Sequence, residues 1–319
     1  MIKVRIGIIS AVFAILISVS SASYANSKYA SLVIDADTGV VLHQENAGKV
    51  RYPASLVKMM TLYLTFQALE SGKLSMDQKI RVSAHAAGQP PSKLGLRSGQ
   101  YIKVRDAILA ITIKSANDAA VVLAEAVGGS EWQFANLSNK MAKKLGMNNT
   151  TYRNASGLHD RKQKTTAYDV ARLAVALRRD YPRFYHLFDR TQFYFNGKLY
   201  RSHNRVSMSY RGADGLKTGY IRASGFNLAT SARRSGRSVV GVVLGGRSTK
   251  SRDRHMTKLL DQSFYKMAMG NSTGAVMQTA STPTPHLKPR NKSQANFSSD
   301  APKPLLKPTA SLPMLIASN

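Results

Sequence analysis

Residues 52–61 read Tyr-Pro-Ala-Ser-Leu-Val-Lys-Met-Met-Thr, and the apolar stretch that they open continues to Leu69. Proline and alanine directly before Ser55 are typical of a helix start. From Leu56 onward the residues are apolar on nearly every side of a helix, whereas a surface helix has one polar face. The stretch therefore predicts a helix that is buried all round, with Ser55 at its protected N-terminal end.

Ser55 and Lys58 are three residues apart, so on a helix they share one face. A serine hydroxyl is a weak nucleophile near neutral pH, and a lysine amine activates it when the pKa of that amine is lowered. Unpaired N–H groups and the helix dipole at a helix start also favour a developing oxyanion. The spacing thus predicts a nucleophile and its base, although a helix-capping serine followed by a solvated lysine gives the same short pattern.

A second polar string, Ser-Ala-Asn at residues 115–117, lies between the apolar run 104–113 and the helical pattern 118–127. We expect it to form a turn that connects two helices. Ser115 then relays a proton between Lys58 and a leaving amine, while Asn117 orients Lys58 and binds a substrate amide. Taken alone, the string fits a Ser/Asn cap of the next helix better than a catalytic role.

The third string is Lys-Thr-Gly at residues 217–219, and it precedes two β-prone runs, 226–231 and 238–244, that predict a hairpin. At the start of a strand beside a cleft, the ammonium and hydroxyl bind a carboxylate and the glycine lets a substrate backbone approach. A second cation near Lys58 lowers the pKa of its amine. The alternative interpretation is a basic turn at a sheet edge.

The chain resembles the low-molecular-mass D-alanyl-D-alanine carboxypeptidases, peptidase family S11, within the superfamily of penicillin-binding proteins and class A β-lactamases. The similarity extends over about residues 28 to 268. It rests on six segments: 52–61, Ser-Ala-Asn-Asp-Ala at 115–119, Asn-Ala-Ser-Gly-Leu-His at 154–159, Asp-Gly-Leu-Lys-Thr-Gly at 214–219, Ser-Gly-Phe-Asn-Leu at 224–228 and Leu-Gly-Gly-Arg at 244–247.

The resemblance implies an α+β fold in which an antiparallel sheet, flanked by helices, packs against a mainly helical subdomain with the active site between them. It implies a penicillin-binding protein that removes the terminal D-alanine from peptidoglycan stem pentapeptides through a Ser55 acyl-enzyme, a hydrolase of cell wall synthesis and remodelling. Penicillins and other β-lactams are expected to acylate it. Neither a cofactor nor a metal is expected, because the seven histidines show no metal-ligand spacing.

Roles carried over by position fall into two groups. The implied catalytic residues are Ser55, Lys58 and Ser115. The implied substrate-binding residues are Asn117, Lys217, Thr218, Gly219, Tyr220 and Arg247. In this assignment Lys217 and Thr218 meet the terminal carboxylate, with Arg247 as a further candidate, and the backbone N–H groups of Ser55 and Tyr220 form the oxyanion hole.

Other activities remain as alternatives. Class A β-lactamases hydrolyse their acyl-enzyme with a glutamate that follows the Ser-x-Asn string, and this chain has no glutamate after Glu131. An endopeptidase that cuts peptidoglycan cross-links uses the same three strings and stays open. So does a non-catalytic basic module that binds the wall, whereas a Ser-His-Asp hydrolase lacks its Gly-x-Ser-x-Gly turn.

Composition predicts three regions. Residues 1–25 combine basic residues, an apolar run at 6–19 and small residues before a cleavage point, so we predict a signal peptide. Residues 26–269 are expected to form the catalytic domain. Residues 270–319 are rich in Pro, Ser, Thr and Lys, which is typical of a disordered tail. The mature protein is expected in the periplasm or cell envelope, soluble or peripheral to the membrane, and the absence of cysteine excludes thiol catalysis.

The charge is strongly basic, with 46 Lys and Arg against 17 Asp and Glu, a net +29. Such an excess predicts an anionic neighbourhood, and wall polymers, lipopolysaccharide or acidic lipids suit an exported chain. Nucleic acid is not expected, because no nucleic-acid-reading motif is recognisable. A solvated basic surface without a partner is the alternative.

Local patterns predict the remaining elements. Residues 29–34 and 40–44 flank a polar turn and predict a strand, turn and strand that open the sheet. Helical patterns dominate from there to about Leu187. Asn-Gly at the centre of 193–200 predicts a hairpin, and a last helix is expected over about 249–267.

Overall fold

The computed structural model describes residues 27–270. The predicted signal peptide at 1–25, and all but the first residue of the predicted tail, lie outside these described residues. Among residues 27–270 no helix combines the length and the apolar character that crossing a bilayer requires.

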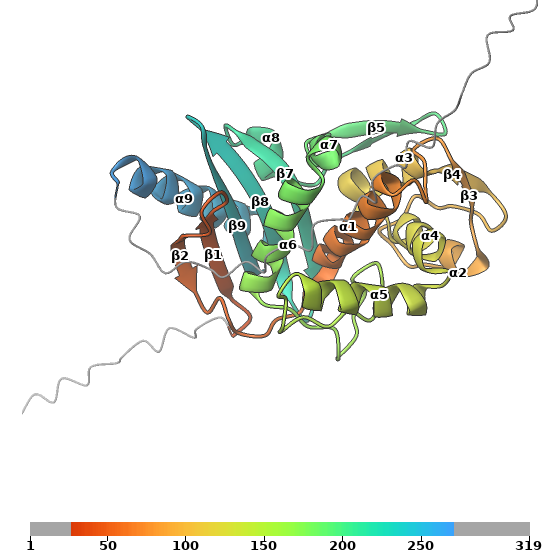
Figure 1. The fold of residues 1–319 in the computed structure, drawn as a ribbon, viewed down its shortest axis with the longest axis horizontal. Helices are drawn as coiled ribbons and strands as arrows, with labels where there is room; N and C mark the ends of the chain where they lie inside the picture. The colour runs from red at the N-terminus through yellow and green to blue at the C-terminus, as the bar shows by residue number, and fades with distance from the viewer. Residues whose placement is uncertain (1–26, 271–319) are drawn as a thin grey trace, which may run out of the picture. The chain divides into compact units, whose positions relative to one another are not determined.

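A five-stranded antiparallel sheet joins the two ends of the described chain (Figure 1). Its strand order is β2-β1-β9-β8-β7, and β1 pairs with β9 from Ala30 opposite Leu244 to Asp35 opposite Val239. As a result β7 is an edge strand. The strands are β1 (Ala30–Asp35), β2 (Val41–Glu45), β7 (Ala213–Ile221), β8 (Gly225–Arg234) and β9 (Arg237–Gly246).

Each face of the sheet is covered by a helix. Successive side chains of a strand point to opposite faces, so a strand that is apolar throughout needs cover on both. Along β9, Val239 and Val243 belong to a small core beneath α9 (Thr249–Ala268). Val240 and Val242 belong instead to the main core, on the face covered by α6 (Ala167–Asp180). Figure 1 shows α9 and α6 on the two sides of the sheet.

The helical part is built around α1 (Val57–Glu70), whose residues are buried from Val57 to Phe66 on every side. This confirms the helix predicted from the apolar stretch. The other helices are α2 (Ala84–Ala87), α3 (Val104–Leu109), the π-helical turn η2 (Ala110–Lys114), α4 (Asn117–Gly128), α5 (Glu131–Lys144), α7 (Pro182–Tyr185), the 3₁₀ turn η3 (His186–Phe188) and α8 (Arg205–Ser209).

The predicted opening strands, both hairpins and the last helix are confirmed, including the hairpin of β5 (Gln192–Phe195) and β6 (Lys198–Arg201). Residues 217–219 were expected at the start of a strand, and this was wrong: β7 begins at Ala213, four residues earlier. The polar and glycine-rich start of β7 hides its strand character, which comes from pairing with β8. A small sheet of β3 (Lys79–Arg81) and β4 (Tyr101–Lys103) also interrupts the expected helical region.

Candidate active site

Ser55 lies in a tight turn where α1 meets the sheet. The 3₁₀ turn η1 (Ala54–Leu56) leads directly into α1, and Ala54 has a left-handed φ of 49°. A non-glycine residue in that region costs on the order of 1–3 kcal/mol, so the surrounding structure must hold the turn in place. Asn227 of β8 does so by donating from Nδ2 to the carbonyls of Tyr52, at 3.0 Å, and Pro53, at 3.1 Å.

Two glycines allow other segments to approach this turn closely. A Cβ on Gly219 of β7 would lie 3.0 Å from the backbone nitrogen of Ser55. Gly157, with φ of +85°, is closer still: a Cβ there would lie 2.0 Å from the Ala54 carbonyl oxygen. The edge strand β7 and the segment 154–158 therefore lie directly against the Ser55 turn, because Gly219 and Gly157 carry no Cβ that would clash with it.

Lys58 lies in the first turn of α1 and is fully buried, with 0% of its surface exposed. Its Nζ lies 3.1 Å from Ser55 Oγ and 2.7 Å from Asn117 Oδ1, and it also donates to the Ser156 carbonyl. Burial and the nearby Lys217 ammonium lower the pKa of Lys58 well below its usual range, against the opposing charges of Asp118 and Glu131.

Lys217, on the edge strand β7, is buried like Lys58. Its Nζ donates to Ser115 Oγ and to the Thr218 carbonyl, both at 2.9 Å. Burial, and then the charge of Arg252, lower the pKa of Lys217 to about 7. Ser115 has a left-handed φ of 59° between η2 and α4, in the turn predicted between two helices.

Asp118 holds the loop at residues 94–96 in place. It is fully buried, and its carboxylate accepts the backbone N–H groups of Leu94 at 3.0 Å, Gly95 at 2.9 Å and Leu96 at 3.1 Å. Asn117 beside it donates from Nδ2 to the Pro90 carbonyl at 2.8 Å. The start of α4 thus holds the loop that precedes β4 against the site.

These walls enclose a cleft of about 410 Å³. Its lining includes Ser55, Ser115, Asn117, Thr218, Gly219 and Tyr220. Tyr220 is 55% exposed, and its ring centroid lies 4.3 Å from that of Phe226, another lining residue. Among the described residues of this lining none is Asp or Glu.

The structure does not bring Arg247 to this cleft. Arg247 follows β9 and is exposed, whereas the guanidinium among the lining residues belongs to Arg252. Arg252 is 3% exposed, and it donates to the Asn227 carbonyl at 3.1 Å and to Asp253 at 2.6 Å. The first turn of α9 directs this side chain back toward the sheet, which a count of residues from β9 does not reveal.

Sequence reasoning missed several residues that shape the site: Asp118, Gly157, Asn227 and Arg252. The segments containing Asp118, Gly157 and Asn227 were recognised as family-like strings, but these three residues were given no geometric role. A glycine facing a strained turn and an amide that bridges two backbone segments leave no local signal beyond the residue type.

Comparisons with known proteins agree with this geometry. The sequence matches the peptidase S11 family, described as D-alanyl-D-alanine carboxypeptidase, over residues 18–248. It is 35% identical over 245 residues to the D-alanyl-D-alanine carboxypeptidase DacF of Bacillus subtilis, which covers 75% of this chain and 63% of that protein. The chain therefore spans less than two thirds of the length of that relative.

Solved structures show the same fold. The D-alanyl-D-alanine carboxypeptidase DacD from Francisella tularensis superimposes with a TM-score of 0.72 at 30% identity, over 73% of this chain and 69% of that chain. Penicillin-binding protein D2 from Listeria monocytogenes, solved with ampicillin bound, gives 0.65 at 31% identity, over 74% and 96% of the two chains.

Replacement of Lys217 by methionine is expected to stabilise the protein. A lysine whose folded-state pKa is about 7 binds fewer protons folded than unfolded, since the unfolded value is about 10.4. The buried Lys217 charge therefore lowers the free energy of unfolding by its full amount below about pH 7, and by less as the pH rises toward the unfolded-state pKa. Lys217→Met should therefore melt at a higher temperature than the wild type, with a larger difference at pH 6 than at pH 9.

The control is Lys250→Met at an exposed position, which should leave the melting temperature nearly unchanged. An equal or lower melting temperature for Lys217→Met across the pH range would contradict the buried-charge account.

Proposed function

The chain belongs to the D-alanyl-D-alanine carboxypeptidase family, peptidase S11, and on that premise we propose that it removes the terminal D-alanine from peptidoglycan stem peptides. The observation that carries the proposal is the buried Lys58 amine within hydrogen-bond distance of both Ser55 and Asn117. A lysine with a lowered pKa beside a serine hydroxyl is the requirement for a serine nucleophile without histidine.

In the first step Lys58 acts as the base. A neutral amine has two N–H donors and one lone pair, and the Asn117 and Ser156 oxygens accept the two donors. The lone pair is then left for the Ser55 proton. As that proton moves to Lys58, Ser55 Oγ bonds to the carbonyl carbon of the penultimate D-alanine, and the backbone N–H groups of Ser55 and Tyr220 donate hydrogen bonds to the oxyanion.

In the second step the bond to the terminal D-alanine breaks. The proton held by Lys58 passes through the Ser115 hydroxyl to the leaving nitrogen, so that D-alanine departs as an amine and Ser55 keeps the acyl group. Water, deprotonated by Lys58, then attacks the ester carbonyl, the bond between the acyl carbon and Ser55 Oγ breaks, and Lys58 returns the proton to Ser55 Oγ. Each group is returned to its starting protonation state.

The terminal carboxylate is the natural anchor for this substrate in a cationic cleft. We assign it to Lys217, Thr218 and Arg252, with Arg252 in place of the sequence-based candidate Arg247. Charge-assisted hydrogen bonds of this kind are the strong ones in ligand recognition. Gly219 leaves room for the substrate backbone beside the edge strand.

Two alternative activities are rapid β-lactam hydrolysis and cleavage of peptidoglycan cross-links. Rapid β-lactam hydrolysis needs a carboxylate that activates water, and the described cleft lining contains neither Asp nor Glu. Slow deacylation after attack by a β-lactam is therefore proposed, in line with the ampicillin-bound structure of the Listeria relative. Cleavage of peptidoglycan cross-links by the same residues remains the alternative activity.

The proposal extends to location and partners. An exported, envelope-associated enzyme fits the signal-like pattern at 1–25 and the substrate class. The net charge of +29 favours contact with anionic wall polymers, lipopolysaccharide or acidic lipids, as a general attraction rather than a defined site.

The direct test uses a diacetylated Lys-D-Ala-D-Ala peptide and a fluorescent penicillin. The wild type is expected to release D-alanine and to bind the penicillin covalently, while Ser55→Ala does neither. Ser209→Ala, at an exposed position of α8, is the control and should behave as the wild type. Penicillin labelling without D-alanine release would favour the endopeptidase, and absence of both would favour a non-catalytic wall-binding module.

The carboxylate assignment has its own test in a pair of arginine variants. Arg252→Gln is expected to lower kcat/KM for the peptide by about 10- to 150-fold, from the roughly 1.5–3 kcal/mol of a hydrogen bond to a charged group. Arg247→Gln should stay within about twofold of the wild type, because its exposed side chain does not line the cleft. The reverse order of effects would restore Arg247 as the anchor.

A further inference from the structure

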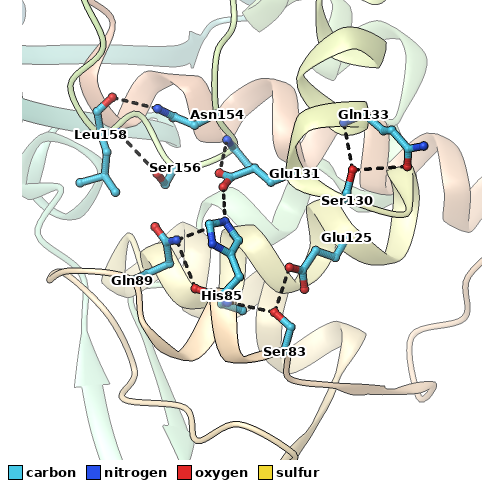
Figure 2. Close-up of polar contacts among 12 residues, drawn as sticks. Ser83, His85, Gln89, Glu125, Ser130, Glu131, Gln133, Asn154, Ser156 and Leu158 are labelled. Carbon is cyan, nitrogen blue, oxygen red and sulfur yellow. Dashed lines mark hydrogen bonds and ion pairs between the residues drawn. The ribbon is translucent and has the colours of Figure 1, made fainter.

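A polar network from α2 and α5 contacts the segment 154–158 (Figure 2). Its centre is Glu131, the first residue of α5, whose side chain is 14% exposed. One carboxylate oxygen accepts the backbone N–H of Ala155 at 2.9 Å, and the other lies 2.6 Å from Nε2 of His85. Both oxygens of Glu131 are thus occupied, and neither lines the cleft.

The segment that Glu131 contacts is also bonded to α1 on its opposite side. The Ala155 carbonyl accepts the Thr61 hydroxyl at 2.7 Å, and the Ser156 carbonyl accepts Lys58 Nζ. Thr61 and Lys58 lie on the same helix, three residues apart. The two consecutive carbonyls therefore face α1, while the carboxylate of α5 holds the N–H from behind.

We propose that Glu131 is a positioning residue for Lys58. By accepting the Ala155 N–H, it holds the Ala155–Ser156 segment so that the Ser156 carbonyl stays in contact with the lysine amine. The inference rests on the proposed function, in which Lys58 is the base for Ser55. Glu131 has no contact with the nucleophile, so its effect is transmitted by the backbone of this segment. A shift of about 1 Å in such a support is enough to slow a reaction by about 10²-fold.

His85 holds the outer side of this network from α2, and its side chain is 56% exposed. Ser83 caps α2 by accepting the Ala86 N–H at 2.9 Å, and its hydroxyl donates to Glu125 of α4 at 2.9 Å. A short helix therefore joins the carboxylates of two longer helices. Glu125 belongs to the network but has no contact with the 154–158 segment among the described hydrogen bonds, which makes it a matched control.

Glu131 also acts on Lys58 through its charge. Burial and the positive charge of Lys217 lower the pKa of Lys58, whereas the negative charges of Asp118 and Glu131 raise it. A Glu131→Gln change removes this charge but retains an oxygen for the Ala155 N–H. A Glu131→Ala change removes both, so the two variants separate the clamp from the charge.

The experiment measures the second-order rate of acylation by a fluorescent penicillin between about pH 5 and about pH 10, using the full chain. We expect Glu131→Ala to acylate about 10- to 100-fold more slowly than the wild type at its pH optimum. Glu131→Gln should stay within about threefold at the optimum, with its acid limb at lower pH, since Lys58 then loses its proton more readily. Glu125→Gln should match the wild type in both respects.

Wild-type rates for Glu131→Ala, or an acid limb of Glu131→Gln that coincides with the wild type, would overturn the proposal. Equal loss in both variants with unchanged pH profiles would do the same, because it would indicate a purely structural role. Should Glu131→Ala fail to fold, the pH profile of Glu131→Gln decides alone. A wild type that is not acylated at all would reject the proposed function, and this inference with it.

Discussion

The structure depends on the burial of one lysine amine. Lys58 lies inside the helical core, and each neighbouring element supplies it with an oxygen or a charge: Ser55 from the turn, Asn117 from α4 and Ser156 from the segment behind. An isolated charge at such a position is costly, so the amine is driven toward its neutral form. A neutral amine in contact with a serine hydroxyl is a base in position, and the chemistry follows from the packing.

The charges around the cleft are arranged in two layers. In the proposed function Lys217 and Arg252 bind the substrate carboxylate, and the nearby Lys217 charge also lowers the pKa of Lys58. Asp118 and Glu131 do not line the cleft: the Asp118 carboxylate accepts backbone N–H groups, and the Glu131 carboxylate contacts the Ala155 N–H and His85. The anions therefore brace the loops that shape the site, while the described cleft lining itself stays free of carboxylates. Such an arrangement suits an anionic substrate and disfavours activation of a hydrolytic water by a carboxylate.

The sequence predicted the parts of the site that depend on local spacing. Ser55 in the turn η1 and Lys58 in the first turn of α1 are three residues apart, and the strings around Asn117 and Lys217 are short enough to recognise, as are the hairpins and the buried helix. Contacts between distant elements were beyond reach: Arg252 rather than Arg247 faces the cleft because α9 turns back onto β8, and Glu131 meets Ala155 across 24 positions of sequence. The short strands β3 and β4 were missed because three polar-flanked residues carry almost no periodic signal.

The central claim is that Lys58 is a neutral amine in the resting protein. Its most direct test is an NMR titration of the lysine side chains in the full-length protein labelled at lysine Cε and Nζ, with Lys58 assigned by its loss in Lys58→Arg. The account predicts that the Lys58 signal is that of a neutral amine near pH 8 and titrates far below the ordinary value of about 10.4. A Lys58 that stays an ammonium until about pH 10 would contradict the account.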